Sequence, residues 1–97
     1  MKYRLSEIAD ICGGRLCGEN LSVDGVETDS RNCAFGRNTL FVAMRGRNHD
    51  SHRYIPQMIE RGLRAFMAEH ECETADGCGT VVVDNAIEAL QRLAEHH

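Results

Sequence analysis

Residues 28–62 read TDSRNCAFGRNTLFVAMRGRNHDSHRYIPQMIERG, and this stretch decides the fold. It begins with a polar turn at residues 28–31 and continues into an apolar run, Thr39–Met44, which favours a strand buried on both faces. A polar loop over residues 45–51 follows, and residues 53–61 have the pattern of an amphipathic helix. Because α/β proteins present ligand-binding groups where a buried strand runs into a polar loop and a helix, the stretch indicates such a site.

The charge of this stretch differs from that of the rest of the chain. Between Ser30 and Tyr54 there are five arginines and one acidic residue, so the segment carries +4 while the whole chain carries −4. A basic segment in an acidic domain favours an anionic partner, and its small size favours a phosphate over a nucleic acid. An ordinary solvated face stays open as the alternative, because the sequence contains neither GxxxxGK[ST] nor GxGxxG.

Length and composition predict one soluble domain. A chain of 97 residues has room for a single hydrophobic core, and 42% hydrophobic with 27% charged residues is typical of globular proteins. No apolar run approaches the roughly 18 residues of a membrane helix, and the first ten residues lack the apolar centre of a signal peptide. We therefore expect a cytoplasmic protein without membrane insertion.

Five cysteines, an odd number, favour reduced thiols over a disulfide framework. The spacing of His70, Cys72 and Cys78 raises the alternative of a small metal-binding protein. It lacks the CxxC pair of structural zinc sites, and a fourth ligand would have to come from elsewhere. A plain surface loop is the favoured interpretation, and no metal site is predicted.

The remaining periodicities predict an α/β fold, a layered sheet with flanking helices. A first helix is expected over residues 5–12, with Ser6 as its N-cap and the Gly13-Gly14 pair as its stop. The residues that follow predict, in order, a short strand or turn at 15–18, a strand at 21–28 kinked at Gly25, strands at Leu63–Ala68 and Thr80–Val83, and a helix over 85–95 capped by Asp84 and Asn85.

Several short motifs then combine into a recognisable order. They are Thr28-Asp29-Ser30-Arg31, Leu40-Phe41-Val42-Ala43, Gly46, Asp50-Ser51-His52, Tyr54-Ile55 and Gly62. Their order and spacing resemble the N-terminal domain of the Mur ligases, whose pattern is roughly (T/L)D(S/T)R, LF(V/I)A, G, DGH or DAH, a helix and G. The resemblance is close from Thr28 to Ala68 and looser toward both ends, so that residues 1–97 are accounted for as one domain.

This resemblance implies a part of an ATP-dependent amide ligase of peptidoglycan synthesis. Mur ligases add an amino acid or dipeptide to a UDP-N-acetylmuramoyl precursor, and their N-terminal domain holds the UDP end. The resemblance implies ATP and Mg²⁺ for the full-length enzyme but no cofactor for this domain. Its partners would be UDP-N-acetylmuramoyl-peptide and the central ATPase and C-terminal domains of the same polypeptide. The central domain's GxxGK(T/S) loop is not in this sequence, so the chain is expected to bind and not to catalyse.

Within the family, the long spacer before Leu40 resembles the members that add D-alanyl-D-alanine, including a form fused to an alanine racemase. Members that add diaminopimelate or lysine remain the alternative. A stand-alone protein-interaction module is an alternative of another class, disfavoured because the last helix runs into His96-His97 without a stop signal.

The resemblance also implies where the UDP contacts lie. One group is the turn with Thr28 and Ser30, where the Ser30 hydroxyl can donate to a phosphate oxygen. The other is the loop Arg47, Asn48 and His49, which corresponds to the family's uracil and ribose contacts. Amide, hydroxyl and backbone groups suit a uracil edge, which presents both donors and acceptors.

Three nearby residues are given structural roles instead. Asp29 and Arg31 are expected to form an ion pair or a turn cap beside Ser30. His52 is expected to cap or orient the second helix, and no catalytic residue is named.

Overall fold

The computed structural model describes residues 2–29, 38–44, 50–70 and 76–96. Its elements, in chain order, are β1 Tyr3–Arg4, α1 Leu5–Cys12, β2 Arg15–Gly18, β3 Ser22–Val23, β4 Gly25–Glu27, β5 Thr39–Val42, the 3-10 helix η1 Ser51–Tyr54, α2 Ile55–Glu60, β6 Ala65–Ala68, β7 Gly79–Val82 and α3 Ala86–His96. The main sheet has the order β2-β7-β6-β5-β4, while β1 and β3 form a separate pair. The predicted α/β class is confirmed.

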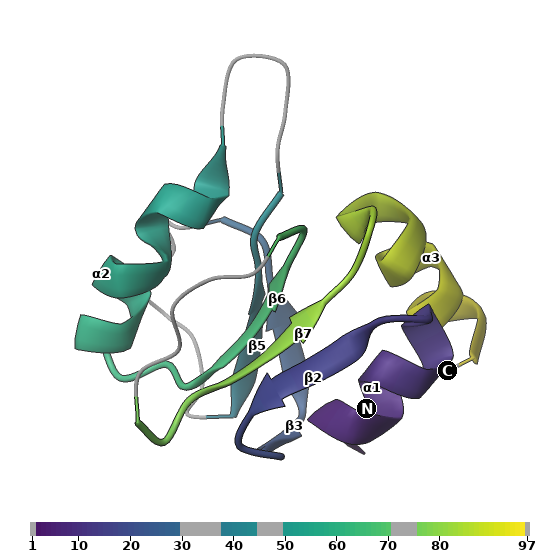
Figure 1. Ribbon diagram of the computed structural model, residues 1–97, viewed down its shortest axis with the longest axis horizontal. Coiled ribbons are helices and arrows are strands. Elements are labelled where there is room, and N and C mark those ends of the chain that lie inside the picture. Colours follow the sequence, from purple (N-terminus) through teal and green to yellow (C-terminus); the bar gives the residue numbers. More distant parts are fainter. Residues whose placement is uncertain (1, 30–37, 45–49, 71–75, 97) are drawn as a thin grey trace.

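Helices cover both faces of the main sheet (Figure 1). α2 lies on one face, and α1 and α3 lie together on the other. Successive side chains of a strand point to opposite faces, so each inner strand contributes to two cores. In β5, Phe41 packs into the core under α2, whereas Leu40 and Val42 pack into the core under α1 and α3. β6 divides in the same way, with Phe66 on the α2 side and Met67 on the other.

Strand direction determines which loops lie together. β4, β5, β6 and β7 are mutually parallel, and β2 joins β7 antiparallel. The C-terminal ends of the four parallel strands therefore lie side by side at the same end of the sheet. We call this row of strand ends the carboxyl edge. The first residues after these four strands are Thr28, Ala43, Glu69 and Val83. Both predicted UDP-contact segments follow strands that end at this edge.

The start of α1 differs from the prediction. Arg4, not Ser6, is the N-cap residue, and the Glu7 carboxylate accepts the Arg4 backbone N–H at 3.0 Å. The Ser6 hydroxyl instead accepts a bond from the Asn20 side chain at 3.0 Å. The helix begins earlier because Leu5 is fully buried and its N–H bonds to the Leu21 carbonyl at 2.8 Å. The predicted stop is confirmed, since Gly13 adopts a left-handed conformation with φ 70°.

The prediction of one kinked strand over residues 21–28 is wrong. The segment forms two strands that belong to different sheets, β3 paired with β1 and β4 paired with β5. The break lies at Asp24, whose N–H bonds to the Asn38 carbonyl at 2.9 Å. An alternating pattern reports which side chains are buried but not which strand each piece will pair with.

The other elements agree with prediction to within a few residues. The expected helix over 53–61 starts as the 3-10 turn η1, and Pro56 lies in the first turn of α2, where its missing N–H costs least. The Asn85 side chain accepts the Glu88 N–H at 2.9 Å and so caps α3 as expected. The sequence pattern missed β1, which has only two residues.

Cys12 lies buried between α1 and α3. Its Sγ–H donates to the Ala89 carbonyl at 3.3 Å, and Ala89 is itself buried. Burial raises the pKa of the Cys12 thiol above its ordinary value of 9.0, and the positive charge of Arg92 opposes this only in part.

This shift predicts a loss of stability at alkaline pH. In the unfolded chain the thiol ionises at its ordinary pKa, whereas the folded chain retains the proton to higher pH. The free energy of unfolding should therefore fall as the pH rises from 9.0 through the folded-state pKa. Urea unfolding between about pH 8 and pH 10 under reducing conditions should show a shallower decline in Cys12→Ala than in the wild type. Identical pH dependence of the two proteins would contradict this assignment.

Candidate ligand-binding site at the carboxyl edge of the sheet

The turn after β4 is organised by one carboxylate. Glu27, the last residue of β4, accepts the backbone N–H groups of Thr28 and Asp29, each at 3.0 Å. Both of these residues are exposed at the carboxyl edge, where Thr28 was expected to meet the ligand. Ser30 and Arg31 lie outside the described residues, so the predicted phosphate contact and the predicted ion pair of Asp29 with Arg31 remain predictions.

The second predicted contact segment leaves β5 at the same edge. Arg47, Asn48 and His49 lie outside the described residues, but the positions on both sides of them are described. Before the segment, the Ala43 N–H bonds to the Met67 carbonyl at 2.8 Å, which ties the end of β5 to β6. After it, Asp50 is the N-cap of η1 and accepts the His52 N–H at 3.0 Å.

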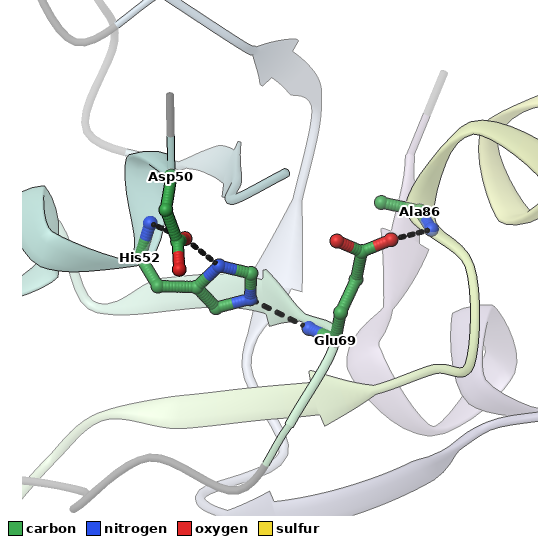
Figure 2. A network of polar contacts seen from close by, with 4 residues as sticks. All are labelled: Asp50, His52, Glu69 and Ala86. Atoms are coloured by element: carbon green, nitrogen blue, oxygen red, sulfur yellow. Dashed lines mark hydrogen bonds and ion pairs between the residues drawn. The ribbon is translucent and has the colours of Figure 1, made fainter. Parts of the chain in front are cut away.

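His52 connects two of the loops at this edge (Figure 2). Its Nδ1 lies 2.5 Å from Asp50 Oδ1, and its Nε2 accepts the backbone N–H of Glu69 at 2.8 Å. An amide nitrogen can only donate, so Nε2 must be the unprotonated nitrogen and Nδ1 must carry the proton. The ring is therefore neutral in this arrangement, and it donates its Nδ1–H to the Asp50 carboxylate.

The connection continues from Glu69 to α3. The Glu69 carboxylate accepts the N–H of Ala86, the first residue of α3, at 3.0 Å. A carboxylate at this point satisfies a helix N–H that has no partner within the helix and interacts favourably with the helix dipole. The chain of contacts through Asp50, His52, Glu69 and Ala86, which we call the edge network, thus joins the residues that follow β5, β6 and β7.

His52 does not cap the second helical segment, because the capping side chain is that of Asp50, which accepts the His52 N–H. That His52 orients this segment stays a prediction, and its connection to Glu69 was not foreseen. The sequence signal that could have suggested a special role is the Asp-x-His spacing, which places a carboxylate beside an imidazole. No local pattern relates His52 to Glu69, because 17 residues separate them.

A metal site at the network is disfavoured by its geometry. Asp50, His52 and His70 offer ligand atoms within 4.8 Å of one another. Both ring nitrogens of His52 are already engaged, and the His52 and His70 rings stack at 4.1 Å with an interplanar angle of 22°. Nearly parallel rings aim their in-plane lone pairs alongside each other and not at a common ion.

The alternative metal-binding group, His70, Cys72 and Cys78, gains no support among the described residues. Cys78 is 2% exposed and packs in the core beneath α2. Cys72 lies outside the described residues.

A polar pocket lies beside the edge network. It has a volume of about 420 Å³ and lies among the end of α1, the start of β2 and the carboxyl ends of β6 and β7. Glu69 and His70 contribute to its lining together with Arg15 and Asp84. Its size is within the range of small-molecule sites. The pocket extends the candidate site along the edge from β4 and β5 toward α3.

Comparison with known proteins finds relatives of two enzyme types. UDP-N-acetylmuramoyl-tripeptide--D-alanyl-D-alanine ligase of Haemophilus influenzae is 32% identical over 96 residues, which are 98% of this chain and 20% of that protein. UDP-N-acetylmuramoyl-L-alanyl-D-glutamate--2,6-diaminopimelate ligase of Parabacteroides distasonis is 36% identical over 93 residues, 90% of this chain and 19% of its own length. No family model matches the chain.

The fold comparison agrees. The structure of UDP-N-acetylmuramoylalanyl-D-glutamyl-2,6-diaminopimelate--D-alanyl-D-alanyl ligase from Acinetobacter baumannii matches with a TM-score of 0.80 and 19% identity, over 96% of this chain and 21% of that one. A crystal structure of MurF from the same organism gives the same TM-score.

By sequence, this chain is homologous to the Mur ligases, and it shares the fold of the matching part of their solved structures. It matches the N-terminal region of the MurF type and also aligns with the diaminopimelate-adding type. It spans about a fifth of the length of the curated relatives that it matches. Among the described residues, no helix is long and apolar enough to cross a bilayer.

Proposed function

We propose that residues 1–97 form the domain that holds the UDP end of UDP-N-acetylmuramoyl-peptide in a cytoplasmic Mur ligase. The observation that carries this proposal is homology over 98% of the chain to a ligase whose name specifies a UDP-N-acetylmuramoyl substrate. The full-length protein would be an ATP-dependent amide ligase of peptidoglycan synthesis. ATP and Mg²⁺ would bind in its central domain.

Addition of D-alanyl-D-alanine is the favoured activity of the whole protein. Relatives of that type from Haemophilus influenzae and Bacillus subtilis each align with 98% of this chain. The diaminopimelate-adding relative aligns with 90% at a higher identity, so that activity is kept as the alternative. The incoming amino acid or dipeptide would be chosen by domains outside these residues.

The proposed UDP contacts are Thr28, Ser30, Arg47, Asn48 and His49. Three observations support them. Their segments leave adjacent parallel strands at the carboxyl edge, where α/β sheets commonly bind ligands. Glu27 holds the backbone of the first turn, and Asp50 closes the second segment. The basic stretch between Ser30 and Tyr54 would attract the diphosphate.

We expect the 97-residue chain to bind UDP weakly, with a dissociation constant nearer millimolar than nanomolar, about −4 to −6 kcal/mol, because other domains would add contacts. Replacing Ser30 by Ala should weaken binding by roughly 1.5–3 kcal/mol, since a hydrogen bond to a charged group is lost. Added salt should weaken it further. Amide shifts followed during a UDP titration would measure all three effects.

Ser22→Ala is the matched control. Ser22 is an exposed serine of β3, and it precedes β4, so it lies toward the opposite end of that strand from Thr28. Its replacement should leave the affinity for UDP unchanged. Shifts concentrated at residues 28–31 and 46–50 would support the proposed site, whereas shifts confined to residues 70–78 would refute it.

A further inference from the structure

The side chain of His52 is buried, with only 5% of its surface exposed, yet it is polar at both ring nitrogens. A buried polar group is costly unless its hydrogen bonds are made. Here both are made, one to Asp50 and one to the N–H of Glu69. Neither a hydrocarbon nor a side chain with a single polar atom could connect the same two segments.

The two bonds act on different parts of the carboxyl edge. Asp50 is where the chain enters η1, so it marks the end of the connection that leaves β5. Glu69 directly follows β6, and its carboxylate reaches the N-terminus of α3. The imidazole therefore sets the distance between the entry to η1 and the end of β6.

The surroundings restrict the ring further. His70 stacks on its face at 4.1 Å, and the backbone N–H of His52 itself donates to the Asp50 carboxylate. Rotation of the ring about its Cβ–Cγ bond would break both side-chain bonds and this stacking. The ring is thus held in one orientation, with both of its nitrogens hydrogen-bonded (Figure 2).

We propose that His52 is a positioning residue for nucleotide binding at the carboxyl edge, and that the affinity for UDP depends on both of its ring hydrogen bonds. This inference rests on the proposed function. His52 itself would not touch the nucleotide. It would hold Asp50, and with it the end of the connection after β5, at a fixed place against β6.

Two substitutions separate the two bonds. In His52→Asn the amide nitrogen can take the place of Nδ1 and still donate to Asp50, but it cannot reach Glu69. In His52→Gln the amide oxygen can take the place of Nε2 and accept from Glu69, but the side-chain donor to Asp50 is lost. Each variant keeps one bond and a polar side chain of similar size. His96→Gln is the matched control, because His96 is exposed at the end of α3.

The experiment is a UDP titration of the 97-residue chain and its variants, followed by amide shifts, at a temperature below the unfolding transition of every protein compared. His52→Asn and His52→Gln should each bind UDP about tenfold more weakly than the wild type. His96→Gln should bind as the wild type does. Unchanged affinity in either folded His52 variant would overturn the proposal and leave the network with a stabilising role alone.

The wild-type chain offers a measurement that needs no substitution. Long-range ¹H–¹⁵N spectra of the His52 ring should show Nδ1 protonated and Nε2 unprotonated, and UDP should shift both the ring signals and the Glu69 amide. A ring and amide that do not respond to saturating UDP would count against the inference. If the wild type shows no UDP-dependent shifts anywhere, the proposed function fails and this inference fails with it. The two failures are therefore distinguishable.

Discussion

Replacing Phe41 by Ala is expected to lower the free energy of unfolding by about 3–5 kcal/mol, because a buried aromatic side chain is lost and a cavity remains. Phe41 lies on β5, between β4 and β6, and has no exposed surface. Its ring meets that of Phe66 edge to face, with centroids 6.4 Å apart. Such an edge-to-face pair adds to the energy of burial alone.

The expected loss of stability is large relative to the total free energy of unfolding. A domain of this size is stable by roughly 5–15 kcal/mol, so Phe41→Ala would remove a substantial fraction. Urea unfolding with an unchanged m value would measure it. Ile87→Ala is the control, because Ile87 is 61% exposed on α3 and should change stability by no more than about 0.5 kcal/mol. A similar small change in Phe41→Ala would show that the strand is not at the centre of the core.

Replacing Gly79 by Ala is expected to cost about 3 kcal/mol, at the upper end of the usual cost of overpacking. A Cβ atom at Gly79 would lie 2.0 Å from the carbonyl oxygen of Glu19 and 2.7 Å from Leu5 Cδ1. Leu5 could adjust, but the carbonyl belongs to the backbone that leaves β2. Because Gly79 pairs with Gly18 of β2 on one side and with Ala65 of β6 on the other, relief would require strands to separate.

Gly25→Ala is the matched control within the same sheet. A Cβ atom at Gly25 would meet only Thr39 Oγ1, at 3.9 Å, which is an ordinary contact. Its stability should stay within about 0.5 kcal/mol of the wild type. Thermal or urea unfolding of the two variants side by side would test the difference. Equal stability of Gly79→Ala and Gly25→Ala would contradict the close approach of β7 to the Glu19 backbone.

The sequence alone determined the buried strands β5, β6 and β7 and the approximate positions of the three helices. Apolar runs around Phe41, Phe66 and Val81 are long enough, and lie between strong enough turn signals, to leave few alternatives to buried strands. The helix end at Gly13 and the cap at Asn85 were predictable for a similar reason. Each depends on a residue type acting on backbone groups within a few positions of itself.

Only the tertiary structure decided which segments pair and which polar groups meet. The break at Asp24 exists because β3 and β4 find partners in different sheets, β1 and β5, and these partners are distant along the chain. The bonds of His52 to Glu69 and of Glu69 to Ala86 each span 17 residues. They form because parallel strands bring their carboxyl ends to one edge. Hydrophobic periodicity reports the burial of a side chain, and it carries no information about the partner that a buried polar atom will find.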